Sequence, residues 1–192
     1  MPWRPSHPLR GALIFLCATW LCGAAFAAPA DLPYTVKPGD MLLVSVWKEP
    51  ELKSPVLVEP DGTFTFPLCG QIDAHGKTVE QLQQQIATKL AHYITDPVVT
   101  VSLQKINGNV VYVIGQVKKP GVFKANPRVD VIQALSMAGG TTPFASLGNI
   151  KILRRTAAGT QVALPFNYND VIHGNGLSEN VILKAGDVVV VP

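Results

Sequence analysis

The segment 110–140 constrains the fold of this chain more than any other stretch. It opens with the apolar run VVYVIGQV, and a second apolar pair, VF, follows after KKPG. Pro120 presets φ at the second position of a turn, and Gly121 suits the third position of a type II turn, where φ is positive. The pattern predicts a β-hairpin whose strands carry the β-branched residues Val111, Val113, Val117 and Val122.

A short helix is predicted directly after this hairpin. Asp130 can cap its first turn, and Gly139, followed by Gly140, can end it in the left-handed conformation. The predicted apolar face consists of Val131, Ile132, Leu135 and Ala138. A hairpin followed by a helix that packs across it is the beginning of a β-grasp arrangement. Because the segment contains no His or Cys, we expect a scaffold or an interaction surface rather than a reactive centre.

Residues 1–27 have the pattern of a signal peptide. Two arginines precede the apolar run 11–25, and Ala25 and Ala27 form the small-residue motif of a cleavage site before Ala28. The run is too short for a comfortable membrane span, so an uncleaved anchor is the less favoured alternative. The sequence predicts export from the cytoplasm with cleavage of this leader.

The cysteines and charges narrow the class of protein further. Cys17 and Cys22 each follow a leucine, whereas a lipidated cysteine normally follows a small residue, so acylation is not expected. Removing the leader leaves 14 basic and 13 acidic residues, and no cluster of Lys or Arg predicts nucleic acid as a partner. The remaining cysteine, Cys69, cannot form an internal disulfide and is expected to be buried.

Residues 28–105 are predicted to form a first domain, which begins with a turn. Pro38 and Gly39 make this turn, and the Asp40 carboxylate can lock it by accepting bonds from backbone N–H groups. The apolar run 41–47 then predicts a strand. A metal-binding or general-base role for Asp40 would need a second polar partner, and the sequence offers none nearby.

A hairpin, a helix and a strand complete this domain. The hairpin is predicted between 56–58 and 64–66, and its turns contain Asp61, Gly62, Pro67 and Gly70. Thr78 and Gln81 form a capping box at the start of the helix. The predicted buried face of the helix consists of Val79, Leu82, Ile86, Leu90 and Tyr93. Alternating apolar residues over 99–104 predict the strand.

The polar segment 106–109 marks the boundary to a second domain over residues 106–192. After the hairpin and helix described above, this domain is predicted to contain strands over 150–155 and 161–164 and a short helix over 168–173. A final strand closes the chain. The complete protein is assigned to the α+β class, with two small domains.

The end of the chain partly repeats a pattern from its beginning. Lys-x-Gly-Asp followed by an apolar strand occurs at 37–40 and again at 184–187, where Gly186 and Asp187 match Gly39 and Asp40. Both domains are expected to end a core strand with the same aspartate-locked turn. The residues between the two motifs do not align, so a complete internal duplication is not predicted.

No residue pattern predicts catalysis, a metal site or a cofactor. The histidines His7, His75, His92 and His173 are far apart, and no cysteine pair or carboxylate cluster has metal-ligand spacing. The scattered aromatic residues, Trp47 among them, are expected to pack in the cores, with stacking against sugars as the alternative. The sequence therefore favours a binding or structural protein.

The motifs, taken in this order, resemble a known family. Those of the first domain are similar to the polysaccharide export domain of outer-membrane polysaccharide export proteins, and comprise Pro38, Gly39, Asp40, Asp61, Gly62, Pro67 and Gly70. Those of the second are similar to the soluble-ligand-binding β-grasp domain of that family, and comprise Gly115, Pro120, Gly121, Ala138, Gly139, Gly140, Gly186 and Asp187. The resemblance covers essentially the whole chain after the leader.

This resemblance implies a component of a capsular or exopolysaccharide export machine. The protein would be periplasmic, associated with the outer membrane, and assembled into a homo-oligomeric ring that guides the polysaccharide. Larger members of the family carry further β-grasp domains and a C-terminal membrane helix. With one β-grasp domain and no such helix after the last strand, the chain is expected to act as a short form. It would work beside a separate outer-membrane barrel and an inner-membrane chain-length regulator or tyrosine kinase.

Two other classes of function stay open. A periplasmic glycan- or small-ligand-binding protein would show an apolar pocket and direct binding of a saccharide by the monomer. An enzyme acting on the polysaccharide would need two acidic residues that face a cleft. Asp40, Asp61, Asp73 and Asp187 all lie in or near predicted turns, so no enzymatic activity is expected.

Overall fold

The computed structural model describes residues 33–156 and 158–192. The predicted cleavage residues Ala25, Ala27 and Ala28 lie outside the described residues. Within the described part, no helix combines the length and the apolar character needed to cross a bilayer. The elements are β1 (Met41–Val46), β2 (Glu49–Leu57), β3 (Thr63–Phe66), β4 (Gly70–Asp73), α1 (Val79–Leu90), β5 (Val99–Lys105), β6 (Val110–Gly115), β7 (Gly121–Lys124), α2 (Val131–Met137), β8 (Ile150–Arg155), β9 (Gln161–Phe166), α3 (Tyr168–Ile172), the 3₁₀ helix η1 (Leu177–Glu179) and β10 (Val188–Val191).

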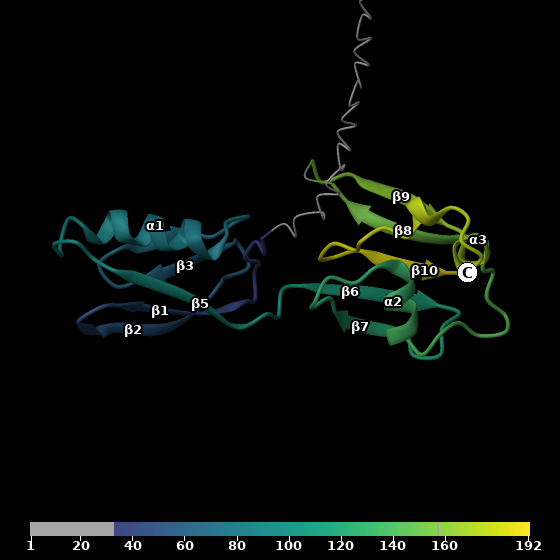
Figure 1. Cartoon of the computed structure of the whole chain (residues 1–192), viewed down its shortest axis with the longest axis horizontal. Helices are drawn as coiled ribbons and strands as arrows, with labels where there is room; N and C mark the ends of the chain where they lie inside the picture. The colour runs from purple at the N-terminus through teal and green to yellow at the C-terminus, as the bar shows by residue number, and fades with distance from the viewer. Residues whose placement is uncertain (1–32, 157) are drawn as a thin grey trace, which may run out of the picture. The chain divides into compact units, whose positions relative to one another are not determined.

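The elements from β1 to β5 enclose a first hydrophobic core (Figure 1). β1 pairs antiparallel with β2 on one side and with β5 on the other, and β3 pairs with β4 in a separate two-stranded sheet. Leu42, Val44 and Val46 of β1 are buried while the residues between them are partly exposed, as expected for a strand with one face toward a core. The buried residues of α1 belong to the same cluster.

Helix α1 begins with the predicted capping box. The Thr78 hydroxyl accepts a hydrogen bond from the Gln81 backbone N–H at 3.3 Å, and the Gln81 side chain accepts one from the Thr78 N–H at 2.9 Å. Two N–H groups that the helix itself cannot satisfy thus have partners. The helix ends at Leu90, so Tyr93 lies beyond it and is 66% exposed. The prediction that Tyr93 extends the buried face is wrong because the helical spacing stops before it.

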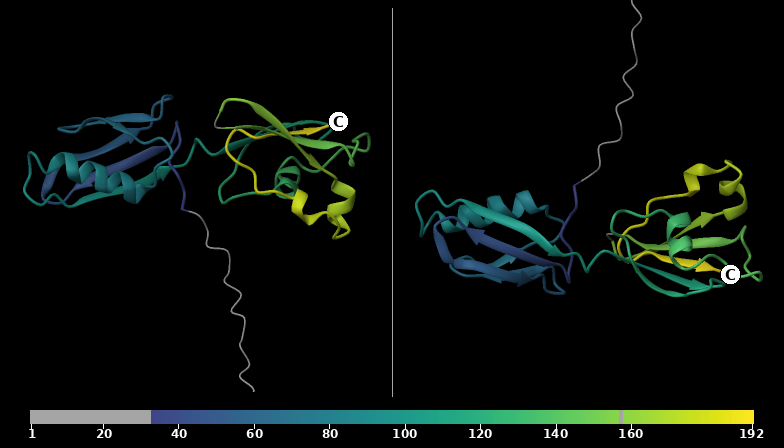
Figure 2. Two further views of the ribbon diagram at one scale, coloured as in Figure 1. Left: turned by 90° about the horizontal axis from the view of Figure 1, so that it is seen from above. Right: turned by 60° about the horizontal axis from the view of Figure 1, so that its bottom comes forward.

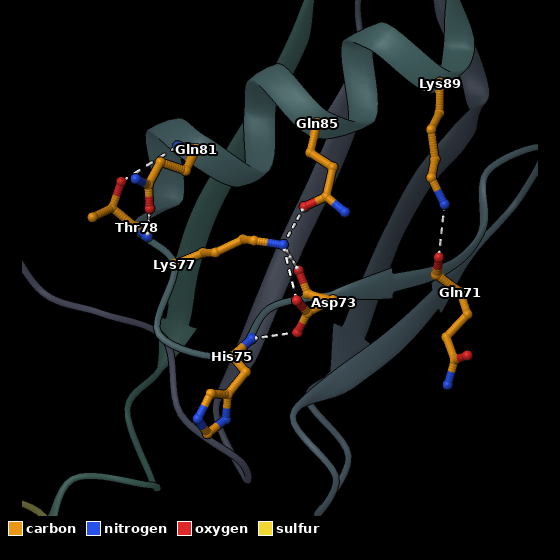
Figure 3. A network of polar contacts seen from close by, with 8 residues as sticks. All are labelled: Gln71, Asp73, His75, Lys77, Thr78, Gln81, Gln85 and Lys89. Atoms are coloured by element: carbon orange, nitrogen blue, oxygen red, sulfur yellow. Dashed lines mark hydrogen bonds and ion pairs between the residues drawn. The ribbon is translucent and has the colours of Figure 1, made fainter. Parts of the chain in front are cut away.

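Lysines beside α1 bind backbone carbonyls of β4 (Figure 3). The Lys77 Nζ atom lies 2.8 Å from the Asp73 carbonyl oxygen and 3.1 Å from its carboxylate, and Lys89 Nζ lies 2.8 Å from the Gln71 carbonyl oxygen. Bonds from the His75 N–H and from Lys77 hold the pKa of Asp73 below its ordinary value. β4 has a strand partner only on its β3 side, and the lysines satisfy carbonyls at its other edge.

The pairing of the strands after β1 differs from the prediction. The sequence predicts a hairpin between 56–58 and 64–66, but β2 pairs with β1 and β3 pairs with β4. The chain does reverse direction where the turn was predicted, and the Gly62 N–H donates to the Glu59 carbonyl at 2.9 Å. The residues around Gly62 specify that the chain reverses its direction. Which strands then pair depends on β1 and β4, which lie elsewhere in the chain.

The second half of the chain builds a five-stranded sheet in the order β7-β6-β10-β8-β9 (Figures 1 and 2). β6 and β7 form an antiparallel hairpin, as do β8 and β9. β10 lies between them, parallel to β6 and antiparallel to β8. Val131 and Leu135 of α2 are buried in one cluster with Val113 and Ile152 of the sheet. This arrangement confirms the predicted α+β class.

The loop of the β6–β7 hairpin differs from the predicted turn. Gly121 is the first residue of β7 and does not have a positive φ. The loop runs over 116–120, so Val117 lies outside the paired strands. The positive φ, +94°, is at Gly115, where β6 ends. The predicted type II turn is therefore wrong, because the close approach of another strand places the flexible residue earlier in the chain.

Candidate functional site

Asp40 is completely buried, and both oxygens of its carboxylate accept hydrogen bonds. One oxygen accepts from the Tyr34 hydroxyl at 2.7 Å and from the Lys37 backbone N–H at 2.9 Å. The other accepts from the backbone N–H groups of Asn107 and Gly108 at 3.0 and 2.9 Å. These four donors offset the cost of burying a charge. The lock predicted for this turn is confirmed, and it also binds the segment 106–109.

Tyr34 begins this turn in the sequence, but its bond to Asp40 and the bond from Gly108 were not predicted. Burial, followed by the hydrogen bond and charge of Asp40, raises the pKa of Tyr34, so the hydroxyl stays a donor at neutral pH. A Cβ atom on Gly108 would lie 2.4 Å from the Pro38 carbonyl oxygen, so a glycine is needed there. A glycine in a polar segment is visible in the sequence, but its acceptor is too distant along the chain to identify.

Asp187 occupies the corresponding turn before β10. Its carboxylate accepts a bond from the Lys184 backbone N–H at 2.8 Å, which matches the bond from Lys37 to Asp40. Its other partner is the Arg154 guanidinium, with Nη2 at 2.6 Å and Nε at 3.1 Å. Asp187 is 1% exposed and the Arg154 side chain 17% exposed, so this is a largely buried ion pair.

Both aspartate-locked turns stand at the start of a core strand. Asp40 immediately precedes β1, and Asp187 immediately precedes β10. The order predicted from the sequence, Lys-x-Gly-Asp followed by an apolar strand, is confirmed at both places, whereas the expectation that the turns end a core strand is wrong. In each turn the aspartate backbone N–H also donates to the carbonyl oxygen of the lysine three residues earlier, at 3.1 Å for Asp40 and 3.0 Å for Asp187. The turn therefore fixes the direction in which the buried strand enters its sheet.

The other predicted turn residues lie in loops and at strand ends of both halves of the described chain. The Asp61 carboxylate accepts bonds from the Thr63 N–H at 2.9 Å and from its hydroxyl at 2.8 Å, and these bonds lower the pKa of Asp61. Pro67 lies in the connection between β3 and β4. The glycines with positive φ are Gly39, Gly62, Gly70, Gly115, Gly139, Gly140 and Gly186 among the predicted positions.

Predicted residues of the second core meet where α2 ends. The Lys118 N–H donates to the Gly140 carbonyl at 3.0 Å, and the Lys119 N–H donates to the Ala138 carbonyl at 2.9 Å. The loop that contains Pro120 is thereby bonded to the helix terminus. The turn at Asp40 is bonded to Asn107 and Gly108, and Gly186 in the turn at Asp187 donates to the Val110 carbonyl at 2.8 Å. The predicted motif residues thus lie in turns and loops that support the strands.

Gly139 and Gly121 should respond differently to the same substitution. Gly139 has φ +78°, whereas Gly121 lies in a strand with open space around the position of a Cβ atom. We expect Gly139→Val to lower the free energy of unfolding by about 1–3 kcal/mol through backbone strain. Gly121→Val should change it by less than about 0.5 kcal/mol. Urea unfolding followed by circular dichroism measures both, and equal effects would contradict these backbone assignments.

The expected absence of metal-ligand clusters and the predicted burial of Cys69 both concern the ionisable residues of the chain. No group of three potential metal ligands occurs in residues 33–156 and 158–192. Cys69 is buried, as predicted, and burial raises the pKa of its thiol. Asp40 and Asp187, the buried acids of this region, are both occupied by the hydrogen bonds described above.

A hollow of about 340 Å³ lies at the tip of the β1–β2 hairpin. Trp47 and Lys48 form this tip between Val46 and Glu49, which pair across the hairpin. Trp47 is 71% exposed, so the expectation that the aromatic residues pack in the cores is wrong for it. Lys48 has φ +66°, a conformation that residues with a Cβ atom rarely adopt. The sequence signal for this site was the pair Trp-Lys where a tight turn usually has Gly or Asn.

Two family models match the chain in succession. Residues 28–104 match the polysaccharide biosynthesis/export protein model, and residues 110–165 match the SLBB domain model. The first match runs from before β1 to the penultimate residue of β5, and the second runs from the start of β6 to the penultimate residue of β9. The chain therefore carries a domain of the polysaccharide biosynthesis/export family followed by an SLBB domain.

Several proteins that are similar in sequence to this chain are named as polysaccharide export or transport proteins. The chain is 29% identical over 182 residues to the EPS I polysaccharide export outer membrane protein EpsA of Ralstonia nicotianae, covering 82% of this chain and 46% of that protein. It is 30% identical over 178 residues to the capsule polysaccharide export protein BexD of Haemophilus influenzae, covering 80% and 42%. It is 27% identical over 195 residues to the polysialic acid transport protein KpsD of Escherichia coli, covering 97% and 34%. The chain spans half or less of the length of these relatives.

Proposed function

We propose that this protein takes part in the export of a capsular or exopolysaccharide across the cell envelope. The observation that carries the proposal is the order of the two domains, which the chain shares with relatives named as polysaccharide export proteins. The absence of a predicted catalytic motif agrees with a non-catalytic role. The protein would act in the periplasm, associated with the outer membrane, after cleavage of its leader before Ala28.

A homo-oligomeric ring is the form in which this chain would guide a polymer. One subunit of this size cannot enclose a chain of sugars, and copies related by rotation can close a ring through a repeated heterologous contact. The proposed partners are the polysaccharide, a separate outer-membrane barrel, and an inner-membrane chain-length regulator or tyrosine kinase. Native mass spectrometry of the purified protein, with and without outer-membrane extract, measures the assembly.

Deletion of the gene tests the export role. We expect polymer to disappear from the cell surface while the synthesis of lipid-linked repeat units continues, because the defect lies after polymer synthesis. Surface polymer is measured by immunostaining and repeat units by mass spectrometry of lipid extracts. A plasmid copy of the gene should restore the surface polymer and serves as the control. Normal surface polymer in the deletion strain, with no second gene of this type in the genome, would contradict the proposal.

A further inference from the structure

The hollow at the β1–β2 tip combines an exposed aromatic ring with unpaired charged groups. Among the large apolar side chains of residues 33–105, the Trp47 side chain is the most exposed. Lys48, Glu49 and Lys53 line the hollow with it, together with Pro50 and Thr100. In the described residues, none of these three charged side chains forms a hydrogen bond or an ion pair. They are available to a ligand from outside the chain.

The tight turn at this tip has a lysine at a positive-φ position, where glycine is the usual residue. Lys48 holds φ +66° at a turn position where glycine would fit without strain. No bond from its side chain accounts for the choice of lysine in the described structure. Strained residues of this kind gather at functional sites, where the side chain is kept for its chemistry. This is an observation independent of the exposure of Trp47.

We infer that this hollow is a binding site for an acidic saccharide. The face of the Trp47 indole suits the apolar face of a sugar ring, and Lys48 and Lys53 can pair with carboxylates. The Glu49 carboxylate can accept bonds from sugar hydroxyls. Two lysines and one glutamate give the lining a net charge of about +1, which favours an anionic ligand. The volume of about 340 Å³ lies in the usual range for small-ligand sites.

The inference deepens the proposed export role, because it names a contact point for the exported polymer and the charge of that polymer. It predicts that the protein recognises uronic acid units rather than neutral sugars. A site of this size binds a short stretch of polymer, so affinity for a single stretch is expected to be weak. A ring would carry one copy of the site in each subunit, and the copies together would hold the polymer more tightly than a single copy does.

Binding of two matched hexasaccharides tests this inference. The probes are a β-1,4-linked mannuronate hexamer and mannohexaose, which share a backbone and differ in the carboxylate. Calorimetry on the full chain should show at least about tenfold tighter binding of the mannuronate hexamer, and this preference should fall as salt is raised. Trp47→Ala should weaken binding of the acidic probe at least about tenfold. Lys53→Gln should remove most of the preference for it.

The controls use residues of the same domain outside the hollow. Tyr93→Ala removes another exposed aromatic ring, and Lys105→Gln removes another exposed lysine, and neither should change the binding. Lys48→Gly should weaken binding while the melting temperature stays the same or rises, because glycine relieves the strain. A purely structural role for Lys48 would give a lower melting temperature instead.

Four outcomes would overturn the inference. The first two are that neither hexamer binds and that both bind equally well. The third is that Trp47→Ala binds the acidic hexamer as tightly as the unchanged protein. The fourth is that no saccharide binds while the protein associates with itself, or binds phosphatidylglycerol vesicles, in a way that depends on Trp47. The last would assign the tip to a second copy or to a membrane surface. A deletion strain that lacks surface polymer, combined with a protein that binds no hexamer, would leave the export role standing and reject this site alone.

Discussion

Gly115→Ala is expected to destabilise the SLBB domain by about 3–5 kcal/mol. A Cβ atom at this position would lie 2.0 Å from the Val191 carbonyl oxygen and 2.9 Å from its carbonyl carbon. Both are backbone atoms of the neighbouring strand β10, so no side-chain rotation can relieve the clash. The φ of +94° adds strain of about 1–3 kcal/mol for a residue other than glycine, and the forced separation of the strands adds a similar amount.

Gly140→Ala separates the cost of backbone strain from the cost of the clash with β10. Gly140 has φ +83°, and a Cβ atom there would meet no atom within 4 Å. Its substitution should therefore cost only the backbone strain, about 1 kcal/mol. Urea unfolding followed by circular dichroism measures both variants. The second domain is expected to unfold in its own transition, because its core cluster is distinct from the first. Equal losses for the two variants would show that the contact with Val191 does not limit this position.

Asp187→Ala is expected to destabilise the same domain by about 3–5 kcal/mol. The substitution leaves the Arg154 guanidinium largely buried with the Ile182 carbonyl but without its carboxylate partner, and it leaves the Lys184 N–H without its acceptor. Removing the arginine as well, in Asp187→Ala/Arg154→Leu, should recover a substantial part of the loss, because no unpaired charge then remains. The free energy of unfolding of the three proteins forms a thermodynamic cycle that reports the coupling of the pair.

A surface ion pair provides the control for this experiment. Asp73 and Lys77 lie 3.1 Å apart with side chains 58% and 31% exposed, so water already screens their interaction. Asp73→Ala should therefore destabilise the protein far less than Asp187→Ala does. If Asp187→Ala proved no more harmful than Asp73→Ala, the buried pair would not be important for the stability of the domain.

The parts of the fold that depend on neighbours in the sequence were predictable. The capping box of α1 and the cap of α2 at Asp130 formed as expected, and Gln133 completes a second capping box that was not predicted. The alternation of buried and exposed residues at the start of β5 also follows from local pattern. The locked turn at Asp40 could be expected from Pro38 and Gly39 because its donor at Lys37 is three residues away.

The parts that depend on distant contacts were not predictable in the same way. Nothing near Gly115 in the sequence shows that the Val191 carbonyl approaches it, so the positive φ was assigned to Gly121 instead. The pairing of β2 with β1 rather than β3 likewise follows from the assembled sheet. Exposed Trp47 was assigned to a core because an aromatic residue at the end of an apolar strand usually packs inside.

If the chain is exported as proposed, the central position of β10 has a consequence for the order in which the chain folds after crossing the inner membrane. Residues 188–191 lie between β6 and β8, and without them the two hairpins of that sheet have no shared ladder. A chain that emerges with its N-terminus first therefore cannot complete the sheet until this last strand has emerged. The apolar residues of the first core all precede β6, so this core can form earlier. Until β10 emerges, the SLBB domain exists only as two separate hairpins with exposed edges, and chaperones would be needed most at this stage.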